Sequence, residues 1–431
     1  MVTSAETGYR NTWLWNIGFS AYWFSTHYKW FILLSLVLPA QVARIVPGGE
    51  KNSAWGTVYA IGAVWGAVGP ALFGAWSDRF DSKFGHRQPF IVAGALVTVL
   101  AIAFMIGANS IPLLVIGYLL LQLGEDIGQG PYAAMMPEIV PPENSGKASA
   151  VMNLLQSAAR LISGLVYLLI NKAGAALMWS PTTVMSVVYG VVALVQVLGA
   201  GTTVYTVRHV RRRKPVDNSD KKAFLVRWLA PWKSADFRWV WITRFMSTFA
   251  FSTVSTYFLF YLTDMFPKLV LFGNDLKDPH VAVIVIVLAM SLLGIVGAWW
   301  SGMIADRVGR KKLILMSGIA MSSVLVPFAL ARDFTFLFVL VVPFGVAFGI
   351  YVSADWALAM DVLPDKDDAG TQMGVWSMSS TSVQIFAGLA GPLIDFGNRI
   401  SFGWGYMGMI WSAGVVFLVS TLLIRKIKGS F

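Results

Sequence analysis

Residues 302–312 read Gly-Met-Ile-Ala-Asp-Arg-Val-Gly-Arg-Lys-Lys, and residues 74–79 read Gly-Ala-Trp-Ser-Asp-Arg. Both stretches lie where a long apolar run gives way to a basic loop. A second matched pair, Glu-Ile-Val-Pro at 138–141 and Asp-Val-Leu-Pro at 361–364, recurs at nearly the same interval. Two matched pairs predict a duplicated unit, and carriers built from repeats bind their solute near the membrane midplane, between the repeats.

The composition indicates that lipid is the main solvent of this chain. Of its 431 residues, 56% are hydrophobic and only 13% are charged, whereas a soluble domain carries about 25% charged residues. Cysteine is absent, which excludes disulfides and thiolate metal sites. The first residues lack the basic stretch and cleavage site of a signal peptide, so we expect the first apolar run to stay in the mature protein.

Apolar runs between polar breaks predict an all-α membrane protein with twelve transmembrane helices. The predicted spans are 20–46, 53–76, 89–108, 112–136, 147–171, 181–207, 240–265, 281–304, 312–331, 334–362, 371–394 and 402–424. Lys and Arg gather in the loops after even-numbered spans, which predicts a multi-pass protein of the cell membrane with both termini in the cytoplasm. The same loops hold most of the net charge of +11, so we do not expect nucleic-acid binding.

The spans divide into two pseudo-symmetric bundles of six helices, residues 1–207 and residues 239–431. The basic stretch 208–238 joins them as a cytoplasmic linker, either solvated or lying as an interfacial helix near anionic headgroups. We expect a monomer that contacts membrane lipids and a small-molecule solute.

The loop from Gly302 to Lys312 resembles the signature loop of the major facilitator superfamily. Its first-half counterpart ends in His-Arg-Gln-Pro-Phe-Ile at 86–91, which resembles the glycoside–pentoside–hexuronide cation symporters and the sucrose–proton symporters. The segments Gly-Pro-Tyr-Ala at 130–133 and Asp-Trp-Ala-Leu at 355–358 are similar to the same group. The resemblance covers essentially the whole chain and implies two bundles that work by alternating access.

The resemblance also implies that the loop residues latch the cytoplasmic side of the carrier in its outward-facing state. Glycines let helices approach closely, and an Asp at a helix end can cap a neighbouring helix and pair with Arg until the bundles rock. The alternative is that these charges only stop the helices at the membrane surface. The predicted gate residues are Gly74, Asp78, Arg79, Arg87, Gly302, Asp306, Arg307 and Arg310.

Ionisable side chains inside the spans are the main functional signal, because each costs about 2.5–3.5 kcal/mol at a helix centre. Cations and carboxylates are nearly balanced, which predicts mutual pairing. In the superfamily fold the first, fourth, seventh and tenth spans line the central cavity, so the resemblance implies a site there. Six of the seven ionisable residues lie in these spans, namely His27, Lys29, Glu125, Asp126, Arg244 and Asp355, and the seventh, Arg160, lies in the fifth span.

The fourth and fifth spans each carry a polar stripe. Gln122, Asp126 and Gln129 share one face of the fourth span, with Glu125 about 100° away. Adjacent carboxylates cannot both ionise cheaply in a low dielectric, so one of them is suited to carry a coupling proton.

The stripe on the fifth span consists of Asn153, Gln156 and Arg160. We expect the two stripes to face each other, with Arg160 bonding one carboxylate of the fourth span. The alternative is an ion pair that only fixes helix packing.

The remaining charged residues have competing interpretations. Lys29 would hold a substrate anion, neutralise the carboxylates of the fourth span, or extend to the membrane surface, while His27 is interpreted as a helix-contact residue. Arg244 lies early in its span, which favours an interfacial side chain. The resemblance implies that Asp355 contacts the solute and that Trp356 stacks on a sugar ring.

We predict a secondary transporter of a small polar solute, foremost a proton-coupled symporter for a sugar or glycoside. One alternative is a carrier or uniporter for an organic anion that meets Lys29 and Arg160, and another is a transporter-like receptor or scaffold. We expect no cofactor; sodium is not expected, because the middle of the second span, residues 65–70, lacks the carboxylates of sodium-coupled relatives. The four histidines form no metal-binding pattern, so an enzyme is not expected.

Overall fold

The structure, a computed structural model, describes residues 9–10, 12–46, 48–66, 69–80, 82, 84–141, 144–209, 229–364, 375–376, 378–380 and 382–428. The chain forms two compact units, and each is described by itself. The first unit holds residues 1–45 and 61–216, and the second holds residues 46–60 and 217–431. Most of the predicted linker 208–238 lies outside the described residues, and the bundle boundaries 1–207 and 239–431 remain a proposal.

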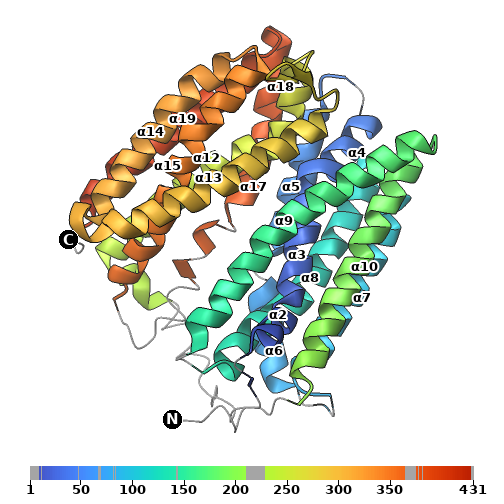
Figure 1. The fold of residues 1–431 in the computed structure, drawn as a ribbon, viewed down its shortest axis with the longest axis vertical. Helices are drawn as coiled ribbons and strands as arrows, with labels where there is room; N and C mark the ends of the chain where they lie inside the picture. Colours follow the sequence, from blue (N-terminus) through green and yellow to red (C-terminus); the bar gives the residue numbers. More distant parts are fainter. Residues whose placement is uncertain are drawn as a thin grey trace. The chain divides into compact units, whose positions relative to one another are not determined.

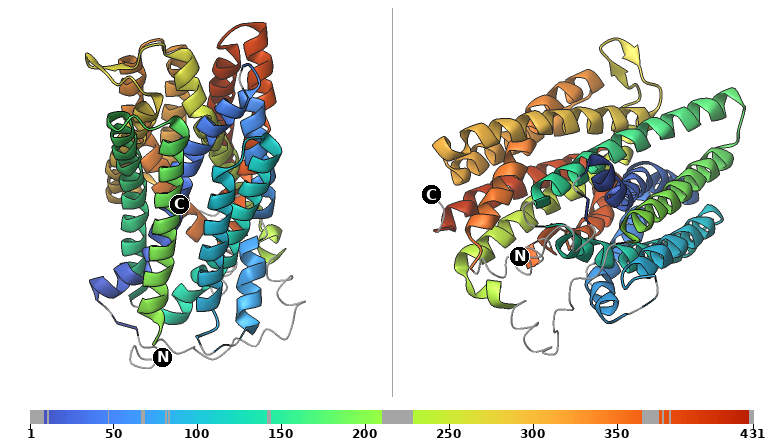
Figure 2. Two further views of the ribbon diagram at one scale, coloured as in Figure 1. Left: turned by 90° about the vertical axis from the view of Figure 1, so that its right-hand side faces the viewer. Right: turned by 60° about the horizontal axis from the view of Figure 1, so that its bottom comes forward.

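The first unit is a bundle of long helices that run side by side (Figures 1 and 2). Polar caps and prolines begin several of these helices: Thr12 accepts from the backbone N–H of Trp15, and Ser180 accepts from that of Thr183. The elements are α2 (Trp13–Phe19), α3 (Ala21–Ile32), η1 (Leu33–Val37), α4 (Leu38–Ile45), the last turns of α5 (Lys51–Gly66), α6 (Gly69–Arg79), α7 (Gln88–Ile106), α8 (Ile111–Ile139), α9 (Ser145–Ala176) and α10 (Pro181–Val207).

The second unit is built in the same way, with Ser234 and Asp333 capping two of its helices. A short hairpin of β1 (Val270–Leu271) and antiparallel β2 (Asn274–Asp275) follows its first long helix. The other elements are the first turns of α5, η3 (Ala230–Lys233), α12 (Ala235–Met265), α13 (Pro279–Val308), α14 (Arg310–Leu330), α15 (Phe334–Asp361), α17 (Val383–Gly388), α18 (Ala390–Ile400), α19 (Trp404–Leu423) and η4 (Ile424–Lys426).

Both units share one packing pattern, which is the structural counterpart of the sequence repeat. In the first unit, α8 packs against α6 and α7, while α10 packs against α3 and α7. In the second unit, α15 packs against α13 and α14, while α19 packs against α12 and α14. Because these helices occupy the same positions in their halves, each of these contacts in one unit has its equivalent in the other.

Among the described residues, ten helices are long and apolar enough to cross a membrane. The second predicted span is divided between α5 and α6, and the eleventh between α17 and α18. With these two, the predicted twelve-helix fold is confirmed.

The first span is not a uniform helix. A break at Ser20 separates α2 from α3, and the hydroxyl of Thr203 donates to the carbonyl groups exposed there. Further along, Leu33–Val37 forms the wider π-helical turn η1, a feature that is frequent at functional sites. Beyond it, the side chain of Gln41 donates to two carbonyl groups at the end of α7. These contacts hold the span on both sides of Lys29.

Candidate functional site

A buried ion pair joins the first and fourth spans in the first unit. The ammonium of Lys29 on α3 bonds Glu125 Oε2 on α8, and the two side chains are 0% and 1% exposed. The ammonium also lies 5.1 Å from the ring centre of Trp30. Burial of two charges costs several kcal/mol per ion unless they are paired, so Lys29 neutralises Glu125. One of the three predicted interpretations of Lys29 is thereby confirmed.

Asp126, the neighbour of Glu125, is buried without a cation. Its Oδ1 accepts from the Gln122 amide at 3.0 Å, while Oδ2 has no partner among the described residues. Gly69 of α6 packs so closely on this carboxylate that an added Cβ would lie under 3.0 Å from Oδ2. Of the two adjacent carboxylates, only Glu125 is therefore bonded to a cation.

The fifth span lies on the other side of α3. Trp23 Nε1 donates to Gln156 Oε1 at 3.2 Å, and the ring of His27 packs on Trp23 at 4.5 Å between centres. Arg160 is exposed, and its guanidinium has no partner in the described part of the chain. The prediction that Arg160 bonds a carboxylate of the fourth span is wrong, because Lys29 takes that place. Gln129, one turn beyond Asp126, is half-buried.

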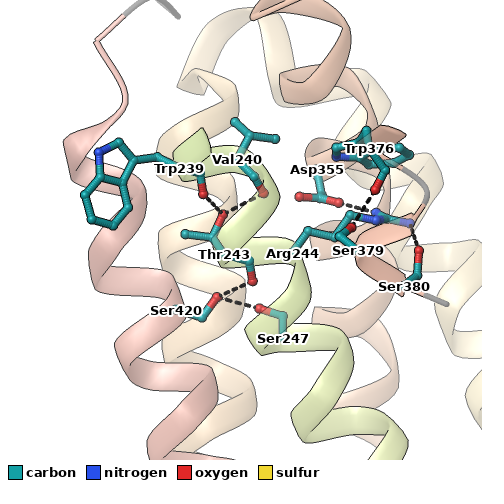
Figure 3. Close-up of polar contacts among 10 residues, drawn as sticks. All are labelled: Trp239, Val240, Thr243, Arg244, Ser247, Asp355, Trp376, Ser379, Ser380 and Ser420. Atoms are coloured by element: carbon teal, nitrogen blue, oxygen red, sulfur yellow. Dashed lines mark hydrogen bonds and ion pairs between the residues drawn. The ribbon is translucent and has the colours of Figure 1, made fainter. Parts of the chain in front are cut away.

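The second unit contains an equivalent ion pair between its first and fourth helices, α12 and α15 (Figure 3). Arg244 pairs with Asp355, which is 2% exposed, and its guanidinium lies 3.6 Å from the ring centre of Trp376. A further nitrogen reaches Ser380 Oγ at 3.5 Å. That Arg244 lies at the membrane interface stays a prediction; the structure shows that its guanidinium pairs with Asp355 of α15.

Aromatic and hydroxyl groups support this second pair. Trp356 meets Trp376 edge-on at 4.8 Å, and it is 49% exposed. Ser420 of α19 donates to the Thr243 carbonyl at 2.7 Å and contacts Ser247, which fixes α12 one turn from Arg244 (Figure 3). Sequence reasoning missed Trp376 and Ser420, since an isolated Trp or Ser in an apolar span gives no signal.

Each unit also holds an ion pair at the end of its fourth helix, beside the repeated loop. Arg87 pairs with Glu138 and donates to Ser77 Oγ at 2.8 Å, while Arg310 pairs with Asp361 and donates to the Ala357 carbonyl at 3.0 Å. Both members of the second matched sequence pair, which begin at Glu138 and Asp361, thus bind loop arginines.

The electrostatics of the first of these pairs are clear. Burial alone raises the pKa of Glu138, but hydrogen bonds from Arg87 and His86 prevail and lower it to about 2. Glu138 is therefore ionised throughout the physiological pH range.

The other predicted gate residues differ in how far the structure describes them. The side chains of Asp78, Arg79 and Asp306 lie outside the described residues, and Arg307 is exposed. An added Cβ on Gly302 would meet no described atom within 4 Å, and one on Gly74 would lie at 3.7 Å from its nearest neighbour. The expected close helix approach is therefore not observed at Gly302. It is observed at Gly74, where α6 packs against α8 and a Cβ added to Gly130 would lie 3.0 Å from the Gly74 backbone nitrogen. Trp65, in the region of the sodium argument, also has no described side chain.

This arrangement of helices defines a multi-pass membrane transporter. The model of the Major Facilitator Superfamily matches residues 17–388. The chain belongs to that family, and it is a transporter and not an enzyme.

Comparison with curated proteins finds sugar transporters over part of the chain. It is 25% identical to sucrose transport protein SUC3 of Arabidopsis thaliana over 157 residues, and 31% identical to SUC4 of the same plant over 143 residues. The human Proton-associated sugar transporter A is 27% identical over 157 residues. These matches cover 31%, 29% and 33% of this chain and 26%, 27% and 19% of the respective relatives.

Solved transporter structures share the fold along nearly the whole chain. A point mutant of the nucleoside transporter NupG superposes with a TM-score of 0.70 at 12% identity, covering 96% of this chain and 99% of its own. The peptide transporter POT in complex with sulfate gives 0.71 at 14% identity, covering 99% and 98%. At such identities the likeness concerns the fold.

Proposed function

We propose that this chain is a proton-coupled symporter for a sugar or glycoside that works by alternating access. The observation that supports it best is the pair of adjacent buried carboxylates, Glu125 and Asp126, of which only Glu125 is bonded to a cation. A carboxylate without a counter-charge in a low dielectric binds a proton readily. Asp126 is then the coupling group, and Lys29 pairs with Glu125 beside it.

Each unit offers groups suited to recognise the solute. Donors and acceptors on the first unit are provided by Gln129, Gln156, Arg160 and His27. On the second unit, Trp356 is 49% exposed and supplies an indole suited to stack on a pyranose ring. The similar proteins support a sugar as the solute, since they are sucrose transport proteins and a proton-associated sugar transporter.

The test is uptake into proteoliposomes under an inward proton gradient, with labelled sucrose and labelled glucosides as probes. We expect accumulation in the wild type. Asp126→Asn should abolish accumulation but keep exchange of labelled for unlabelled sugar, because binding survives while the proton site is lost. Asp333→Asn, at an exposed helix cap, serves as the matched control and should transport normally. Unimpaired accumulation by Asp126→Asn would refute this assignment.

A second candidate, a carrier of organic anions, is favoured by one observation. Arg160 is a cation in the middle of the span 147–176 without a partner among the described residues, and a carboxylate on the solute would supply its counter-charge. Uptake of glucuronate should then exceed uptake of glucose, and Arg160→Gln should reverse that preference. If wild type and Arg160→Gln show the same ratio of glucuronate uptake to glucose uptake, the organic-anion hypothesis is contradicted.

A further inference from the structure

The helix α5 is divided between the two compact units. Its first turns, up to Ala60, belong to the second unit, and the residues from Ile61 onward belong to the first. The helix therefore passes from one unit to the other within a single continuous stretch of backbone. The first turns of α5 are therefore held by contacts within the second unit.

A buried carboxylate of the second unit caps the start of α5. Asp395 of α18 is 2% exposed, and it accepts the backbone N–H of Ser53 at 2.7 Å, the hydroxyl of the same serine, and the amide of Asn52 at 2.8 Å. The first N–H groups of a helix lack partners within the helix and carry its positive dipole end. A carboxylate supplied from a distant part of the chain satisfies both requirements.

A second carboxylate of the same unit completes the contact. Lys51 pairs with Asp264 at the end of α12, and the hydroxyl of Tyr406 donates to that carboxylate at 2.7 Å. The Asn52 amide reaches the Tyr406 oxygen at 3.2 Å. We call this set, Lys51, Asn52, Ser53, Asp264, Asp395 and Tyr406, the α5 clamp.

The backbones meet directly beneath the α5 clamp. A Cβ added to Gly56 would lie under 3.0 Å from the carbonyl of Gly388, and the converse holds for Gly388 against Gly56. The Trp55 side chain is 0% exposed, and its indole donates to the Thr256 carbonyl at 2.8 Å. The start of α5 therefore packs closely against the second unit, and the α5 clamp adds ion pairs and hydrogen bonds to this packing.

The chemistry of this contact suits a reversible step. Charged and polar groups regain hydrogen bonds to water when they separate, so a contact made through them can be released at a small net cost, whereas each bond is strong while water is excluded. We propose that Asp395 is a positioning residue of the transport cycle. Its carboxylate fastens the first turns of α5 to the second unit, and the carrier opens at this end only when Asp395 releases them. In the proposed topology this end is extracellular.

The absence of cysteine from the chain makes a direct test simple. Val58, on the fastened part of α5, is 0% exposed, so a single Val58→Cys reporter is shielded while the α5 clamp is closed. Its rate of reaction with a membrane-impermeant maleimide is measured in proteoliposomes without any solute. We expect Asp395→Ala to raise this rate by at least tenfold, and Asp395→Glu to restore most of the protection.

The matched control is Asp333→Ala. Asp333 also caps a helix N-terminus through a backbone N–H, but it caps its own helix α15, so its loss should leave the reporter rate unchanged. If Asp395→Ala does not fold, Lys51→Met removes the neighbouring ion pair and should raise the rate by a smaller factor. An unchanged rate in folded Asp395→Ala, or an equal rise in Asp333→Ala, overturns the proposal. The measurement needs no transported sugar, so it stands or fails independently of the proposed symport.

Discussion

At the scale of single residues, the interior of the spans is organised by pairs of opposite charge. Removal of one member of a buried pair leaves an uncompensated charge and costs about 3–5 kcal/mol. Lys29→Met should therefore lower the melting temperature of the purified protein strongly, whereas Lys29→Met combined with Glu125→Gln should recover much of the loss. Thermal unfolding in detergent checks this prediction. Equal melting temperatures for the single and the double variant would contradict it.

A second prediction at this scale concerns pH. The ordinary pKa of a Glu, 4.5, falls to about 2 for Glu138 in the folded protein, so its bonds with Arg87 stabilise the fold above pH 4.5. That contribution, about 2 kcal/mol after allowance for partial exposure, is lost as the pH falls from 4.5 toward 2. The acid-induced drop in melting temperature should be smaller in Glu138→Gln. Glu50→Gln removes an exposed pair with Arg399 and should behave like the wild type.

Single residues were also where prediction from the sequence reached its limit. Near-balance of charges correctly indicated pairing, but helical periodicity gives the face of a side chain and not the neighbour that it meets. Lys29 and Arg160 are equally good partners for Glu125 on that basis, and only the three-dimensional structure, in which Lys29 of α3 reaches Glu125 of α8, decides for Lys29. Trp376 is an isolated aromatic residue with no periodic signal in the sequence, so its contact with Arg244 could not be foreseen.

At the scale of elements, the breaks within spans matter as much as the helices. Apolar runs located the spans well, yet the interruption at Ser20 has no sequence signal, because its free carbonyl groups are satisfied by a hydroxyl from a distant helix. Thr203→Val keeps the shape of that side chain and removes the donor, which should cost about 1–3 kcal/mol. Thr206→Val, one turn along α10, loses only a bond to its own helix and should cost far less. Similar melting temperatures for both variants would contradict this account.

At the scale of the whole molecule, the repeat determined what could be predicted. One repeated loop sequence and one repeated Pro-containing sequence are sufficient to predict a duplicated bundle, because each bundle must bury the same helix faces. The repeat also extends to the ion pairs, which was not foreseen, since Lys29 and Arg244 differ in type and context. Arg244→Met should therefore destabilise the protein to a degree similar to Lys29→Met, and Asp355→Asn should partly rescue it. A neutral effect of Arg244→Met would mean that the second pair is not equivalent to the first.

The twin ion pairs bear on how the carrier responds to the membrane voltage. Moving one elementary charge through 100 mV changes the energy by about 2.3 kcal/mol. The net charge of each ion pair, Lys29 with Glu125 and Arg244 with Asp355, is zero. Either unit can shift in the electric field without doing work through these four groups. Any voltage sensitivity then comes from charges outside the pairs, such as Arg160 and, in the proposed proton symport, a proton on Asp126.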